Sequence, residues 1–74
     1  MTAIEFKYMT EALSADLAEM LAHDYGLGIE TALDTLYNSK TYAKLTDPAT
    51  GLYFQSSGYV YSFLKNEVTT GKMA

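Results

Sequence analysis

Apolar residues recur at steps of three and four along the first part of the chain. Over residues 4–25 these positions line one face of an α-helix, whereas a strand would alternate apolar and polar positions. The positions are Phe6, Met9, Leu13, Leu17, Met20 and Leu21. Gly26 follows where a left-handed residue commonly ends a helix, and no proline or glycine precedes it. The pattern therefore predicts one long helix over residues 4–25.

Two shorter helices are predicted after this stop. Gly28 opens the first, and Asn38 interrupts it. Its inner face is formed by Ile29, Ala32, Leu33 and Leu36. Ser39 can cap a third helix over residues 40–45, because a serine hydroxyl accepts a hydrogen bond from a free backbone N–H. The residues of this helix expected to face inward are Tyr42, Ala43 and Leu45.

A turn and a last helix complete the pattern. The segment from Asp47 to Gly51 has turn chemistry, since Pro48 restricts φ and Gly51 permits a positive φ. Residues 52–55 are predicted to be briefly extended, residues 58–68 to be helical, and residues 69–74 to fray. The positions that mark the last helical period are Val60, Phe63, Leu64 and Glu67. The sequence thus predicts a single all-α domain over residues 1–74, a small bundle of three to four short helices.

Composition and charge narrow the possible partners. The chain is 49% hydrophobic and 14% aromatic, which is typical of a folded domain. It has no cysteine and one histidine, so disulfides are excluded and a structural zinc site is disfavoured, and we expect oligomerisation to supplement so small a core. Five lysines against nine acidic residues give a net charge of −4, which repels nucleic acid.

The sequence contains no obvious targeting or membrane signal. The first residues lack the basic stretch and the apolar run of a signal peptide. No segment approaches the roughly 18 apolar residues that a membrane span requires. We therefore expect a cytoplasmic protein that does not bind membranes.

Two patterns resemble catalytic or metal sites and are better explained as ordinary surface. Asp16, Glu19 and His23 share one helical face, but the polar face of any surface helix produces this spacing, and a catalytic metal needs three well-held ligands. Ser62 and Lys65 match the Ser-x-x-Lys pattern of some acyl enzymes without its companion motifs. We predict no enzymatic activity, no cofactor and no metal.

A helix-turn-helix is the alternative for the middle of the chain. The two short helices around Asn38 would place Lys40, Thr41 and Lys44 on a second helix that could contact DNA. A six-residue recognition helix is short, and two lysines form a weak electrostatic footprint. A small DNA-binding regulator therefore remains an alternative, as does an accessory subunit of an enzyme.

Aromatic residues are crowded toward the C-terminal end. Half of the ten aromatic residues fall within eleven positions, namely Tyr53, Phe54, Tyr59, Tyr61 and Phe63. Such rings either close a small core or form a half-wetted interface. Tyr59 and Tyr61 are about 200° apart on a helix, so one should serve the core and the other the surface. We predict partner binding, to a protein or to a second copy, through Tyr53, Phe54, Tyr59 and Tyr61.

Three stretches of the chain resemble a group of small uncharacterised bacterial proteins of unknown function. They are LYNSKTY from Leu36, DPATGLY from Asp47 and YVYSFL from Tyr59. Proteins of this kind are similar to ones often encoded beside toxin-like or ADP-ribosyltransferase-like partners. The resemblance implies an antitoxin or accessory role and carries over no catalytic residues. Together with the aromatic segment, it predicts a non-enzymatic protein-interaction module that self-associates or acts as an antitoxin-like partner.

Overall fold

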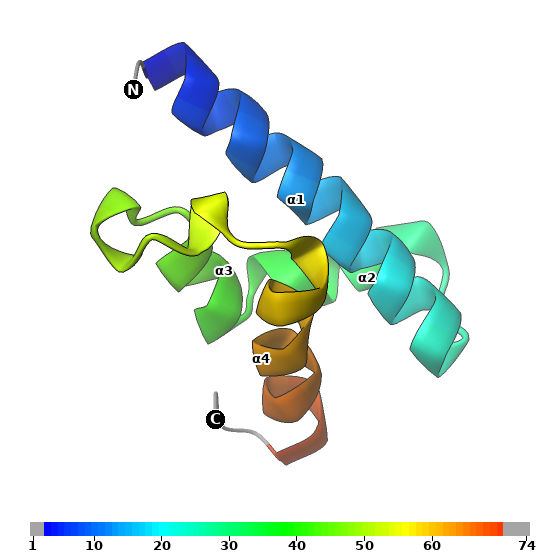
Figure 1. Ribbon diagram of the computed structural model, residues 1–74. Coiled ribbons are helices and arrows are strands. Elements are labelled where there is room, and N and C mark those ends of the chain that lie inside the picture. Colours follow the sequence, from blue (N-terminus) through cyan, green and yellow to red (C-terminus); the bar gives the residue numbers. More distant parts are fainter. Residues whose placement is uncertain (1–2, 71–74) are drawn as a thin grey trace.

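The computed structural model describes residues 3–70, and these residues form helices and turns without any strand. Four α-helices are present: α1 (Ala3–Tyr25), α2 (Ile29–Tyr37), α3 (Lys40–Leu45) and α4 (Ser57–Thr70). Two short 3-10 helices, η1 (Pro48–Thr50) and η2 (Leu52–Phe54), connect α3 to α4 (Figure 1). The predicted all-α fold is confirmed.

Local chemistry sets the end of α1, the start of α3 and the turn after α3 where the sequence predicted them. Gly26 adopts a φ of 64° directly after α1, and Gly51 adopts a φ of 70° between the two 3-10 helices. The Ser39 hydroxyl accepts a hydrogen bond of 3.0 Å from the backbone N–H of Tyr42 at the start of α3. The Asp47 carboxylate accepts one of 3.0 Å from the Ala49 N–H at the start of η1. The two side chains satisfy backbone N–H donors that would otherwise be unpaired.

The segment after Gly51 is not extended, contrary to the prediction for residues 52–55. Leu52 and Tyr53 are both buried, whereas an extended strand points consecutive side chains to opposite faces. The 3-10 turn also bonds the backbone internally, from Phe54 N to Gly51 O at 3.2 Å and from Gln55 N to Leu52 O at 3.0 Å. A lone extended segment would have left these groups without partners.

α4 is longer than predicted, since it begins at Ser57 and continues to Thr70. Thr69 was expected to fray, but it is helical, and its hydroxyl forms a 3.0 Å hydrogen bond with the Tyr25 hydroxyl. The rest of the tail for which fraying was predicted, residues 71–74, lies outside the described residues. The C-terminal helix is therefore tied to the end of α1.

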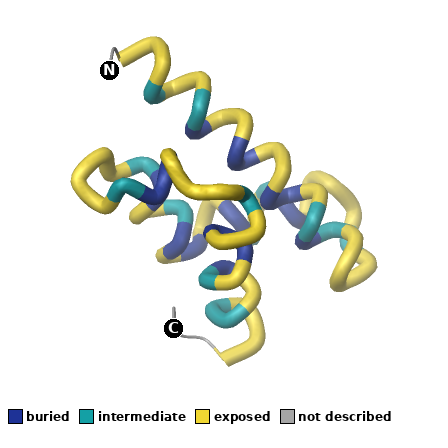
Figure 2. Tube along the Cα trace, in the orientation of Figure 1, coloured by how far each residue is buried: buried dark blue, intermediate teal, exposed yellow. Residues whose placement is uncertain are grey.

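The core lies where α1, α2, α3 and α4 meet (Figure 2). Its fully buried apolar residues are Leu17, Ala18, Leu21, Ala32, Leu36, Leu45, Val60 and Leu64. Leu33 is only half-buried, and Ile29 is 50% exposed, so the inner face of α2 is narrower than predicted. In α3 the prediction for Ala43 is wrong: it is exposed, and Thr41 is buried instead.

α2 turns back through Gly26 and packs along the C-terminal part of α1. α4 crosses the same part of α1, and η2 contacts the helix nearer its start. The first turns of α1 extend beyond the other elements (Figure 1). None of the helices within residues 3–70 combines the length and apolar character needed to cross a membrane.

Candidate functional site

The four residues predicted to bind a partner divide into two pairs. Tyr53 and Tyr61 are 8% and 7% exposed and belong to the core. Phe54 and Tyr59 are 60% and 50% exposed. Tyr59 and Tyr61 therefore face opposite sides of α4, as the helical geometry predicts. Of the four predicted residues, only Phe54 and Tyr59 are accessible to a partner in this fold.

The exposed rings of this segment rest on rings beneath them. Phe54 stacks on Tyr53 with centroids 4.2 Å apart and planes 29° apart, and Tyr53 in turn forms a T-shaped pair with Phe6, with centroids 4.8 Å apart. Tyr59 packs edge to face on the half-buried Phe63, with centroids 5.1 Å apart. Such contacts restrict the rotation of an exposed ring. Both rings are thus presented to solvent in a defined orientation.

Another exposed ring lies at the end of α2, directly before the helix break at Asn38. Tyr37 is 53% exposed and meets the ring of Tyr42 edge to face, with centroids 5.0 Å apart. The two rings border a cleft of about 300 Å³ between α1, α2 and α3. The cleft is lined by Thr10, Glu11, Ser14, Ala15, Leu33, Tyr37 and Tyr42. We had not predicted this cleft, although the five-residue spacing of two tyrosines across a helix break could have indicated it.

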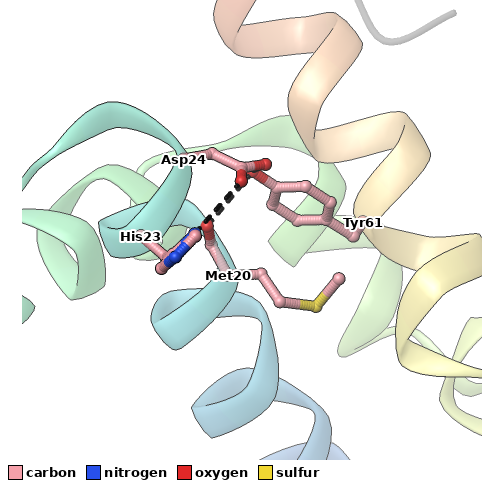
Figure 3. Close-up of polar contacts among 4 residues, drawn as sticks. All are labelled: Met20, His23, Asp24 and Tyr61. Carbon is pink, nitrogen blue, oxygen red and sulfur yellow. Dashed lines mark hydrogen bonds and ion pairs between the residues drawn. The ribbon is translucent and has the colours of Figure 1, made fainter.

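Tyr61 uses its hydroxyl to join α4 to the end of α1 (Figure 3). The hydroxyl donates to a carboxylate oxygen of Asp24 at 2.6 Å, and the Met20 carbonyl lies 3.4 Å from it. This hydrogen bond lowers the pKa of Asp24, with a smaller contribution from His23. Burial and the neighbouring carboxylate raise the pKa of Tyr61. The Tyr61 hydroxyl therefore acts as a donor that holds two helices together.

His23 lies on the surface beside Asp24, at the end of α1. Its Nδ1 lies 3.7 Å from the carboxylate of Asp24, and 91% of its side chain is exposed. Among residues 3–70, no group of three or more His, Cys, Asp or Glu residues is placed to hold a metal ion. Asp16 and Glu19 share a helical face with His23 but do not form a ligand set with it.

Ser62 and Lys65, the other pattern that resembles a catalytic site, do not form a catalytic pair, because the serine hydroxyl is bonded to its own helix. The Ser62 hydroxyl donates to the Tyr59 carbonyl of its own helix at 2.6 Å. Ser62 and Lys65 are both exposed on α4. Their exposure does not match the water-excluded pocket that an acyl intermediate requires.

The start of α3 is occupied by a carboxylate from α4. One oxygen of Glu67 accepts from the Lys40 N–H at 2.7 Å, and the other accepts from the N–H and the hydroxyl of Thr41 at 2.9 and 2.8 Å. Burial opposes the charged form of Glu67, but these hydrogen bonds outweigh it and lower its pKa overall. The N–H groups that a recognition helix would direct at a DNA phosphate are thus already bonded.

The DNA-binding alternative loses support from this arrangement. Thr41, one of its three candidate contact residues, is fully buried, while Lys40 and Lys44 are exposed. The sequence pattern places Glu67 on the helical period of α4 but does not indicate that it caps α3. The pairing joins residues 26 positions apart, and no local signal identifies such a contact.

No family model matches the chain, and no curated protein or solved structure is significantly similar to it. The resemblance to small bacterial proteins encoded beside toxin-like partners therefore stays a prediction.

Proposed function

We propose that the protein is a non-enzymatic protein-interaction module that holds its partner through aromatic rings on its surface. The observation that carries this proposal is that Tyr37, Phe54 and Tyr59 are each at least half exposed, and each packs against a more buried ring. A side chain that is already oriented loses little conformational freedom on binding, so more of its burial appears as affinity. Aromatic residues are also enriched at protein interfaces.

The proposal includes an antitoxin-like role, in which this small domain is the neutralising partner of a larger protein. It also places the protein in the cytoplasm, because a chain without cysteine needs no oxidising compartment in order to fold. The partner is another protein or a second copy of this chain, and these two cases differ in a single measurement. Sedimentation of the purified chain alone reveals a dimer, whereas a partner of another kind leaves the chain monomeric.

The test is recovery of a stoichiometric partner by the tagged full-length chain in its native cells, followed by affinity measurements with variants. Phe54→Ala and Tyr59→Ala should each weaken binding by about 1 to 2 kcal/mol, roughly tenfold, as expected for aromatic anchors. Ile29→Ala is the matched control, since Ile29 is also a large apolar residue, 50% exposed, but is not aromatic. It should change the affinity by no more than about twofold.

Circular dichroism of each variant should match the wild type, which separates lost binding from lost folding. Two results together would contradict the proposal. One is a monomer at high micromolar concentration, and the other is the failure to recover any stoichiometric partner from the native cells.

A further inference from the structure

The net negative charge of the protein is concentrated on α1. This helix carries five acidic residues and one lysine, whereas the rest of the chain carries four of each, so α1 accounts for the whole net charge of −4. The acidic residues are Glu5, Glu11, Asp16, Glu19 and Asp24, and the lysine is Lys7. Within residues 3–70 no ion pair involves Glu11, Asp16 or Glu19. A positively charged partner would therefore be attracted to α1 and not to the molecule as a whole.

The first half of α1 also exposes large apolar side chains on one side. Ile4 is 82% exposed and Tyr8 is 73% exposed, which are the highest values among the large hydrophobic residues. At about 100° per residue, Ile4, Tyr8 and Ala15 lie within about 40° of one another around the helix. The opposite side of this half holds the core contact of Phe6 with Tyr53. Figure 2 shows these first turns as mostly exposed, away from the other elements.

The cleft between α1, α2 and α3 adjoins this apolar side, because Glu11 and Ala15 line it. Thr10 and Ser14 also line the cleft, but their hydroxyls donate to carbonyls of α1 at 2.8 and 2.7 Å. Glu11 is the single charged residue in the lining.

The aromatic wall of the cleft complements this carboxylate. Tyr37 and Tyr42 form the wall on the α2 and α3 side, with their rings edge to face. A carboxylate together with aromatic rings suits a cation carried on an apolar stem, because the charge pairs with the carboxylate and the ring faces attract it as well. A lysine or arginine side chain has this chemistry.

We propose that this surface docks a basic amphipathic helix of another protein, with one lysine or arginine side chain inserted between Glu11 and the two tyrosine rings. The apolar face of that helix covers Ile4 and Tyr8. A second copy of this chain is the poorer occupant, because it would bring two strongly acidic helices together, and juxtaposed like charges oppose association. The inference rests on the proposed function, since it names the chemistry of the partner of the same module.

The probe is a synthetic 18-residue helical peptide of leucine, alanine and arginine, titrated into the ¹⁵N-labelled full-length protein. Its control is the same peptide with citrulline at every arginine, which keeps the shape and removes the charge. The arginine peptide should bind saturably and shift the amide signals of Glu11, Ala15, Tyr37 and Tyr42. The citrulline peptide should bind at least tenfold more weakly.

Two variants separate the cleft from general attraction to an acidic helix. Glu11→Gln and Glu19→Gln each remove one negative charge from an exposed position on α1, but only Glu11 lines the cleft. Glu11→Gln should raise the Kd of the arginine peptide at least fivefold, and Glu19→Gln should raise it no more than twofold. Both side chains are exposed, so we expect both variants to fold.

Equal effects of the two variants would overturn the inference, because the attraction would then belong to the whole helix. Equal binding of the citrulline peptide would overturn it, and so would shifts confined to other surfaces. A dimer of the chain alone that buries Tyr8 would also overturn it, since the face would then hold a second copy. The proposed function is tested separately, through Phe54 and Tyr59 and the native partner. The proposed function can therefore be correct even if the arginine peptide does not bind, and it can be wrong even if the peptide binds.

Discussion

The two halves of α1 share one hydrophobic period and differ in how much of the helix the other elements cover. In the second half, Leu17 and Leu21 are fully buried, and Asp24 bonds to Tyr61 of α4. In the first half, the contact of Phe6 with Tyr53 is the one ring contact to another element, and Tyr8 on the other side is 73% exposed. The same helix is therefore a core element at one end and an open surface at the other.

The difference follows from the lengths of the helices. α1 has 23 residues and is about 35 Å long, whereas α2 has 9 residues and is about 14 Å long. Since α2 turns back directly at Gly26, it can cover only the part of α1 nearest that turn. The second half of α1 is then packed against other helices, and the side of the first half that carries Ile4 and Tyr8 is left accessible for binding.

The largest effect should come from Leu17→Ala in the second half. The side chain is fully buried, so its truncation should lower the free energy of unfolding by about 3 to 5 kcal/mol. A domain of this size has little stability to lose, and the variant should be largely unfolded at room temperature. Urea denaturation followed by circular dichroism measures this. A loss below about 1 kcal/mol would mean that α1 is not anchored where the structure places it.

Phe6→Ala tests the first half in the same way and should lower the free energy of unfolding by about 2 kcal/mol, since this ring is only half-buried. The loss should also be local, because the ring packs on Tyr53 of η2, about three helical turns along α1 from the fully buried Leu17. Hydrogen exchange should accelerate in the first turns of α1 and around Tyr53 before it does elsewhere. An effect as large as that of Leu17→Ala would remove the contrast between the halves.

Glu67→Gln tests whether an acidic residue outside α1 contributes to the stability of the fold. Removing the carboxylate that caps α3 should lower the free energy of unfolding by about 1 to 2 kcal/mol at neutral pH. The folded state lowers the pKa of Glu67, so its contribution is present above the ordinary value of 4.5 and is lost as the pH falls through the lowered pKa. Stability curves of wild type and variant should thus converge at low pH. Glu19→Gln, on the exposed side of α1, should leave the wild-type curve unchanged.

Tyr61→Phe removes only the hydroxyl that links α4 to the second half of α1. Because one hydrogen bond is lost and the ring stays, the melting temperature should fall by only a few degrees. The pKa of Asp24, which this hydrogen bond lowers, should rise toward its ordinary value of 3.8. The stabilisation linked to Asp24 is present above that value and is lost as the pH falls through the lowered pKa. NMR titration of the Asp24 carboxyl measures the shift, and an unchanged pKa would contradict the link.

Ile4→Ala and Tyr8→Ala should have the smallest effect on stability, less than about 0.5 kcal/mol each, since both side chains are largely exposed. Each should nevertheless weaken binding of the arginine peptide. Thermal melts and peptide titrations of the same samples separate the two readouts. A clear loss of stability would show that the first half of α1 has a structural contact on this side as well.

The sequence by itself determined where α1 ends, where α3 begins and where the chain turns after α3. Gly26, Ser39, Asp47 and Gly51 act on backbone groups only a few residues away, so their effects can be derived from local chemistry. The periodic apolar positions likewise predicted which side of α1 faces the core. The prediction that residues 52–55 are extended was wrong. Leu52 and Tyr53 are consecutive and both buried, which a 3-10 turn allows and an extended segment does not, and their burial depends on the packing of the whole core.

Only the tertiary structure decided which aromatic rings are buried and which polar groups meet. Tyr61 bonds to Asp24 across 37 positions, and the hydroxyl and N–H of the buried Thr41 find their acceptor in Glu67, 26 positions away. Helical period places Tyr59 and Tyr61 on opposite sides of α4, but it does not say which side another helix covers. That choice depends on how far α2 and α4 extend along α1, because burial is a property of the packed helices together and not of one segment.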